Sequence, residues 1–161
     1  MKVCCLFLMY ILLGHSNIML KNVKKMPLLY GNTKHINLEH VYPKSFLNKK
    51  HHKEIHNIFA SNGKMNSLRS NYKFGIGNYI VDHKKRIFVP RIEDRGIIAR
   101  SLLFMNDIYS YTLKKVITEE ELLYEWNKLY EPTEKEIIHN IYGHQVQGYD
   151  NPYITKYNKL R

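Results

Sequence analysis

Glu39 and His40 are adjacent residues, so the chain places a carboxylate beside an imidazole in the segment 37–43. A neutral imidazole can take a proton from water, and a carboxylate can hold a hard cation that keeps most of its own waters. Hydrolysis of a phosphodiester needs both, because a water must be activated and the charge on the phosphate oxygens must be balanced. An isolated Glu-His pair is usually structural, so the pair alone does not establish this chemistry.

Asn66 and Arg69 follow at short range and are three residues apart, which places them on one face of a helix. Arg69 has two interpretations that the sequence leaves equal. It could clamp a phosphate of a substrate, or it could form an internal bridge that holds the helix to the following hairpin.

The basic charge is unevenly distributed. Residues 17–116 contain 19 Lys and Arg against 6 Asp and Glu, whereas residues 117–161 contain 5 against 8. This favours a polyanionic partner, with nucleic acid first and an anionic membrane surface second. A general drift of composition toward lysine would not spare the last part of the chain. The basic loop beside the Glu-His pair predicts phosphate contacts, with a solvated loop as the alternative; its lysines are Lys44, Lys49, Lys50 and Lys53.

The hydrophobic patterns predict a single α+β domain. Capping boxes mark two of the expected helices, at Thr118–Glu121 and at Thr133–Glu136. The expected elements are a strand at 35–42, a helix at 54–68, a hairpin of 79–81 with 86–89, and helices at 95–113, from 118 to Pro132 and from 133 to about Gly148.

The N-terminus has the pattern of a signal peptide. Lys2 precedes an apolar run from Val3 to Leu13, and Gly14-His-Ser16 supplies a small-x-small site. We therefore expect residues 1–16 to be a signal peptide that directs the domain 17–161 to a secreted or periplasm-like compartment; a first buried element of the domain is the alternative. Both cysteines lie in this run, so no disulfide framework or cysteine zinc site is expected in residues 17–161.

Several further blocks lie in order along residues 35–154: 56–59, 66–71, 90–96, 98–105, 125–127, 147–148 and 151–153. Together with Glu39-His40 they resemble the endonuclease I family of the ββα-metal (His-Me finger) nucleases. The resemblance implies a ββα-metal core with a helical C-terminal cover. It also implies that Glu39 and Asn66 hold one Mg²⁺, that His40 is the general base, and that the substrate is DNA, often RNA as well. Family enzymes leave a 5′-phosphate and a 3′-hydroxyl.

The chain departs from the family pattern at one position that matters for catalysis. Family members commonly place an arginine between the Glu-His pair and the helix, whereas this stretch holds only Lys and His. A catalytically weak nucleic-acid-binding protein on the same scaffold is therefore the alternative. We expect little sequence preference, no membrane partner and a monomer. A zinc site at His51, His52 and His56 is a less favoured interpretation, because no fourth ligand is evident.

Overall fold

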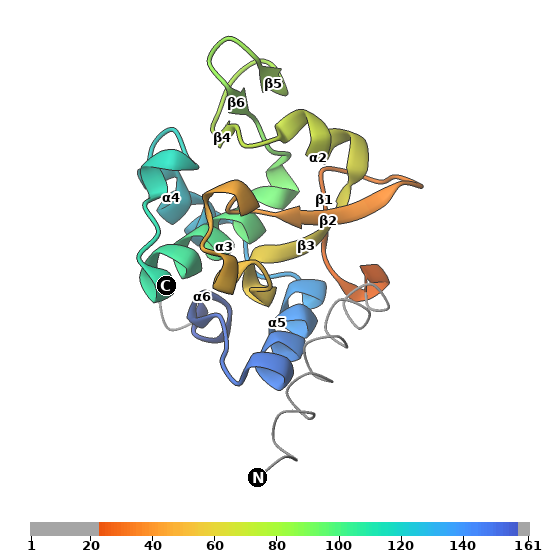
Figure 1. The fold of residues 1–161 in the computed structure, drawn as a ribbon, viewed down its shortest axis with the longest axis vertical. Coiled ribbons are helices and arrows are strands. Elements are labelled where there is room, and N and C mark those ends of the chain that lie inside the picture. The colour runs from red at the N-terminus through yellow and green to blue at the C-terminus, as the bar shows by residue number, and fades with distance from the viewer. Residues whose placement is uncertain (1–22, 158–161) are drawn as a thin grey trace.

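The computed structural model describes residues 23–157, so the expected signal peptide lies outside the described residues. The fold combines small sheets with helices, and the predicted α+β class is confirmed (Figure 1). The elements are β1 (Leu28–Leu29), β2 (Ile36–His40), β3 (Ile58–Asn62), α2 (Gly63–Arg69), β4 (Lys73–Phe74), β5 (Val81–Asp82), β6 (Ile87–Phe88), α3 (Ile92–Tyr109), α4 (Glu121–Leu129), α5 (Glu134–Gln147) and α6 (Pro152–Thr155).

The first sheet carries the Glu-His pair. β3 is its central strand, parallel to β1 and antiparallel to β2, in a register that sets Glu39 opposite Phe59 and His40 opposite Ile58. α2 follows β3 directly, because the side chain of Asn62 accepts hydrogen bonds from the backbone N–H groups of Lys64 and Met65 and so caps the helix. Strand, strand and helix thus succeed one another beside the pair.

The prediction of a helix over residues 54–68 is wrong in its first part. Residues 58–62 form β3, and the helix is confined to residues 63–69. The strand is central in its sheet, and Ile58, Phe59 and Ala60 are all buried. A short apolar run that is covered on both faces has no alternation, so its pattern does not distinguish a strand from a buried helix.

The predicted hairpin is confirmed. β5 and β6 pair antiparallel, and β4 pairs parallel with β6 to complete a second small sheet. The sheet is joined to the rest of the fold through Phe74, which bridges to Ile117. In Figure 1 this sheet lies beside α2.

The C-terminal helices also follow the prediction, with shifted ends. α3 begins and ends a few residues earlier than expected. It ends at Tyr109 because Ser110 adopts a left-handed conformation with φ of 58°. The side chain of Thr133 caps α5 as predicted, and Gly148 ends it with φ of 85°. The capping box at Thr118 is wrong, because α4 starts at Glu121 without a side-chain cap.

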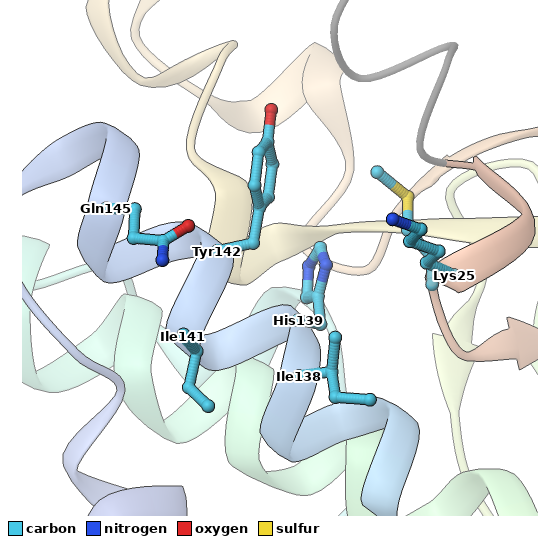
Figure 2. Close-up of a pocket in the computed structure, with 7 residues that line it drawn as sticks. Lys25, Ile138, His139, Ile141, Tyr142 and Gln145 are labelled. Atoms are coloured by element: carbon cyan, nitrogen blue, oxygen red, sulfur yellow. The ribbon is translucent and has the colours of Figure 1, made fainter.

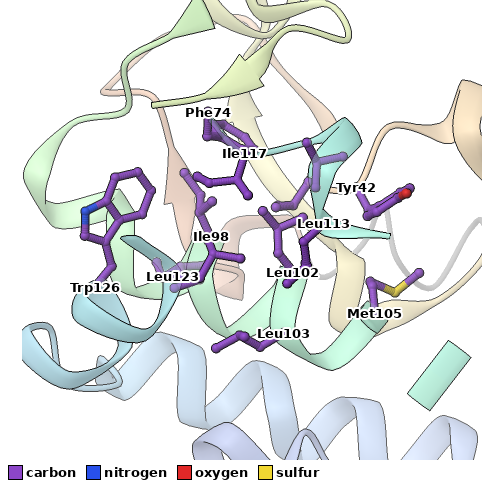
Figure 3. Packing of buried hydrophobic residues seen from close by; sticks show 14 of the residues in the cluster. Tyr42, Phe74, Ile98, Leu102, Leu103, Met105, Leu113, Ile117, Leu123 and Trp126 are labelled. Carbon is purple, nitrogen blue, oxygen red and sulfur yellow. The ribbon is translucent and has the colours of Figure 1, made fainter. Parts of the chain in front are cut away.

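The hydrophobic core lies around α3, which packs most extensively against α4. Figure 3 shows Ile98 and Leu102 of α3 among Tyr42, Phe74 and Trp126 from other elements. The core therefore fixes the segment that follows β2 and the end of β4, through Tyr42 and Phe74. No helix within residues 23–157 has the length and apolar character needed to cross a membrane.

Candidate active site

Glu39, His40, Lys44, Asn66 and Arg69 line one pocket of about 420 Å³. β2 supplies the first two, the turn after it supplies Lys44, and α2 supplies the last two. The remaining lining residues are Leu38, Pro43, Ser45, Ser70 and Asn71. Four of the predicted site residues from two separate segments, and one lysine of the basic loop, are therefore brought together.

Glu39 is almost fully buried, with 3% of its surface exposed. Its Oε1 accepts a hydrogen bond of 2.8 Å from the Tyr30 hydroxyl and one of 2.9 Å from Nη1 of Arg69. Burial raises the pKa of the Glu39 carboxyl, and the Arg69 charge and the Tyr30 hydrogen bond oppose that rise. Neither of these two hydrogen bonds uses Oε2.

Arg69 is 1% exposed and holds β2 from within the fold. Besides the ion pair to Glu39, its guanidinium donates to the backbone carbonyls of His40 (3.1 Å) and Val41 (2.7 Å). It also lies 4.4 Å from the centre of the Phe74 ring. The geometry is that of the internal bridge, directed to β2 instead of the hairpin. The phosphate-clamp interpretation is not supported, because Arg69 is buried and both Nη atoms donate to the chain around β2.

His40 has a defined orientation. Its Nε2 lies 3.0 Å from the backbone carbonyl of His52. Because a carbonyl oxygen only accepts, Nε2 carries the proton and Nδ1 keeps its lone pair. Burial lowers the pKa of His40; the hydrogen bond to His52 opposes this, and the positive charge of Lys44 adds to the lowering. The imidazole is therefore neutral at pH 7, with one nitrogen able to accept a proton.

Asn66 has its amide orientation fixed by β2. Its Nδ2 donates to Oδ1 of Asn37 (3.0 Å) and to the backbone carbonyl of Leu38 (3.2 Å). The Leu38 carbonyl can only accept, so the amide nitrogen must face it and the amide oxygen turns the other way. Sequence reasoning missed Asn37. It lies two residues before Glu39 in the strand, so both side chains lie on the same face of the sheet, and this spacing could have indicated a contact with α2.

The Glu39 carboxylate and the Asn66 amide oxygen are the donor types that a hydrated Mg²⁺ accepts, and both residues line the same pocket. A Mg²⁺ ion of this kind needs only one or two protein ligands because it retains its waters. The residues present therefore fit such an ion.

The zinc interpretation of the histidines is not supported. Within residues 23–157 no group of three or more His, Cys, Asp or Glu side chains could hold a metal ion. His51 contacts the Tyr111 hydroxyl, while Nε2 of His52 and of His56 contact the backbone carbonyls of Leu47 and Tyr149. Each ring has a separate structural partner.

The lysines of the basic loop do not act as one group. Lys44 lines the pocket with Glu39 and His40, whereas Lys50 and Lys53 line another pocket, of about 260 Å³. Lys49 is exposed and lines neither of these two. The sequence placed all four at the site, and the fold brings Lys44 alone of them to the pocket.

A further pocket, of about 450 Å³, lies at α5 and has a mostly apolar wall (Figure 2). It is lined by Lys25, Met26, Ile138, His139, Ile141, Tyr142 and Gln145. Burial lowers the pKa of His139 to about 4, and its Nε2 lies 2.9 Å from the carbonyl oxygen of Ile55. This pocket holds no pair of a carboxylate and an amide like that of Glu39 and Asn66, so the predicted site residues lie at the other pocket.

The pocket thus combines an oriented imidazole with a carboxylate and an amide, and β2, β3 and α2 frame it. Residues 17–158 match the family model described as Endonuclease I. The chain therefore belongs to the endonuclease I family, as the resemblance in the sequence indicated.

Curated relatives agree with this assignment. The chain is 31% identical to a periplasmic deoxyribonuclease of Aeromonas hydrophila over 64% of its own length and 47% of that protein. It is 27% identical to Endonuclease-1 of Buchnera aphidicola subsp. Baizongia pistaciae, over 63% of the chain and 45% of the relative. An extracellular deoxyribonuclease of Aeromonas hydrophila is 31% identical over 64% of the chain and 49% of that protein. The chain thus spans about half the length of the curated relatives it matches.

Proposed function

We propose that this protein is a Mg²⁺-dependent endonuclease that hydrolyses phosphodiester bonds of DNA, and of RNA as well, with little sequence preference. The observation that carries the proposal is the contact between Nε2 of His40 and the His52 carbonyl, which orients His40 in the pocket that Glu39 and Asn66 also line. An imidazole, a carboxylate and an amide come from residues that line one pocket, and metal-assisted phosphodiester hydrolysis requires such a set of groups. The names of the relatives, deoxyribonucleases and Endonuclease-1, support a nucleic acid as substrate.

In the proposed mechanism Glu39 and Asn66 hold the cation. When bound, magnesium supplies positive charge to the phosphate oxygens and to the departing 3′ oxygen. His40 accepts a proton at Nδ1 from a water as the water oxygen bonds to phosphorus. The bond between phosphorus and the 3′ oxygen then breaks, and that oxygen takes a proton from solvent. The products are a 5′-phosphate and a 3′-hydroxyl, as the family resemblance implies.

Two cationic residues have different proposed roles. Arg69 is a positioning residue, because its hydrogen bonds set Glu39 and the end of β2. Lys44 is exposed and lines the pocket. We therefore propose that Lys44 contacts the substrate phosphate that an arginine contacts in family members. Lysine lacks the bidentate fork of arginine, so this contact is weaker.

Export and a lack of sequence preference complete the proposal. The names of two relatives, periplasmic and extracellular deoxyribonuclease, support removal of residues 1–16 as a signal peptide and action outside the cytoplasm. Phosphate contacts set affinity without reading bases. We also propose that the protein is a monomer.

Plasmid nicking by the chain from Asn17 onward tests the proposal, with magnesium or EDTA, for the unchanged protein, His40→Ala and the control His144→Ala. His144 is an exposed residue of α5 that pairs with Asp150. We expect magnesium-dependent nicking that His40→Ala reduces by about 10²-fold or more and that His144→Ala leaves unchanged. Plasmid that is retarded in a gel but uncut under all conditions would favour the nucleic-acid-binding alternative.

A further inference from the structure

The turn of the β5–β6 hairpin is a compact basic feature outside the pocket. It consists of His83, Lys84, Lys85 and Arg86, all exposed. Asp82 is the one acidic residue between Lys73 and Phe88, and its Oδ1 accepts the backbone N–H of Lys85 at 2.9 Å. The lysine side chains therefore extend from a turn whose backbone is fixed.

The turn stands on a rigid base. The N–H of Lys73 donates to the carbonyl of Arg86 (3.1 Å), which joins the turn to β4. β4 is joined in turn to the helical part of the fold, because Phe74 exchanges backbone hydrogen bonds with Val116 (2.8 Å) and Thr118 (2.9 Å). Phe74 and Phe88 are both buried in the core. The charges are thus held at a defined place relative to the pocket.

Arg86 connects the turn to the edge of the pocket. Its Nη2 donates to Oδ1 of Asn71, a residue that lines the pocket with Glu39 and His40. The guanidinium lies 4.9 Å from the centre of the Tyr72 ring, and the Tyr72 hydroxyl lies 3.2 Å from Nδ1 of His83. A continuous polar path therefore runs from the proposed site of cleavage to the basic turn.

From this geometry we propose that the turn 83–86 binds the phosphate backbone of the substrate a few nucleotides away from the bond that is cut. The inference rests on the proposed function. A polymer that places one phosphate at His40 must continue across the surrounding surface, and the turn offers charges of the opposite sign beside the pocket. It would raise affinity and leave the chemistry in the pocket unchanged.

An anionic membrane surface is the competing partner, because the loop before β5 exposes apolar side chains. Ile76, Tyr79 and Ile80 are 56%, 75% and 60% exposed. These residues precede β5, whereas the basic turn follows it, so charge and apolar surface are at opposite ends of the strand. The direct link from Arg86 to Asn71 favours nucleic acid, since it places the charge beside the pocket.

The test compares Lys84→Glu/Lys85→Glu with the control Lys128→Glu/Lys135→Glu. The control residues are exposed lysines of α4 and α5, and their substitution changes the net charge by the same amount. Binding of a labelled DNA duplex is measured in EDTA over a range of salt, and turnover of bis(p-nitrophenyl) phosphate is measured with magnesium. We expect the hairpin variant to bind DNA about 10-fold more weakly, with a salt slope smaller by about 2. Turnover of the small diester, which reaches the pocket alone, should be unchanged.

Equal DNA affinity in the hairpin and control variants would overturn the proposal. So would loss of binding to vesicles of phosphatidylcholine and phosphatidylserine with DNA affinity retained, which would assign the turn to a membrane surface. Absence of diester turnover in every protein would contradict the proposed function instead, and the DNA affinities would still decide the role of the turn.

Discussion

Among residues 23–157 two arginine–carboxylate pairs are buried, and they differ in how many carboxylate oxygens the arginine contacts. Arg100 of α3 grips Glu136 of α5 with two bonds, Nε to Oε1 at 2.7 Å and Nη2 to Oε2 at 2.8 Å. Arg69 of α2 makes one such bond to Glu39, to the Oε1 that also accepts from Tyr30. Glu39 lines a polar pocket, whereas Glu136 lines none of the three pockets described above.

We infer that this difference separates a structural pair from a pair that belongs to the proposed site. A bidentate pair occupies both oxygens, so its carboxylate has little left to offer a cation. When the arginine bonds only one oxygen of a carboxylate, it orients the carboxylate and balances part of its negative charge. The arginine then makes no hydrogen bond to the other oxygen. We infer that Glu136 fastens α5 to α3, while Glu39 is held in place for a ligand.

Removing the arginine of either pair should have the largest effect on folding. Arg100→Met and Arg69→Met each leave a buried carboxylate without its partner, so we expect the free energy of unfolding in urea to fall by about 3–5 kcal/mol. Turnover per folded molecule should be retained in Arg100→Met and lost in Arg69→Met, because Glu39 and the end of β2 depend on Arg69. Equal turnover in the two variants would contradict the distinction between the pairs.

Asn66→Ala should weaken cation binding without unfolding the protein, because Asn66 is partly exposed. We expect the magnesium concentration for half-maximal activity to rise about 10-fold or more, since one of the two proposed protein ligands is removed. Asn78→Ala, in the exposed loop before β5, is the matched control. An unchanged magnesium requirement in Asn66→Ala would remove Asn66 from the proposed site.

Tyr30→Phe removes one of the two side-chain bonds to Oε1 of Glu39 and leaves Arg69 in place. A hydrogen bond to a charged group contributes about 1.5 kcal/mol, so urea unfolding should show a loss of that size. Magnesium-dependent activity should fall less than in Arg69→Met. A loss of stability as large as that of Arg69→Met would mean that the two partners are not independent.

The pH dependence provides the most subtle test. Burial lowers the pKa of His40 below its ordinary value of 6.5. We therefore expect kcat/KM to rise with pH along an acid limb that lies below pH 6.5 and to be constant above it, where His40 is neutral. Because the Lys44 charge contributes to the lowering, Lys44→Gln should move this limb to higher pH, and Lys49→Gln should not. A limb above pH 6.5 in the unchanged protein would indicate that His40 is not the base.

Local signals predicted much of this fold. α5 was placed from its two ends, because Thr133 caps the helix through its own side chain and Gly148 supplies the left-handed residue that stops it. β3 was not recognised, because burial on both faces comes from the tertiary structure and leaves no alternation in residues 58–62. The α+β class was therefore correct although one central element was wrong.

The candidate site was predictable in its residues but not in their partners. The resemblance to the endonuclease I family selected Glu39, His40 and Asn66, and all three line one pocket. The orienting group for His40 is the backbone carbonyl of His52, and a backbone atom carries no signal in the residue types. Likewise, the sequence could not decide between the two interpretations of Arg69, since its partners are set by how α2 packs on β2.

Calorimetric titration of magnesium into the unchanged protein, Glu39→Gln and Glu136→Gln tests the central distinction most directly. Circular dichroism would establish that each variant is folded. If Glu39→Gln were not folded, Glu39→Asp would replace it in the titration. We expect folded Glu39→Gln to lose the heat of magnesium binding, and folded Glu136→Gln to retain it. If Glu39→Asp is used instead, we expect weaker magnesium binding, because the shorter side chain withdraws the carboxylate from the ion. Unchanged magnesium affinity in the folded Glu39 variant would contradict the account.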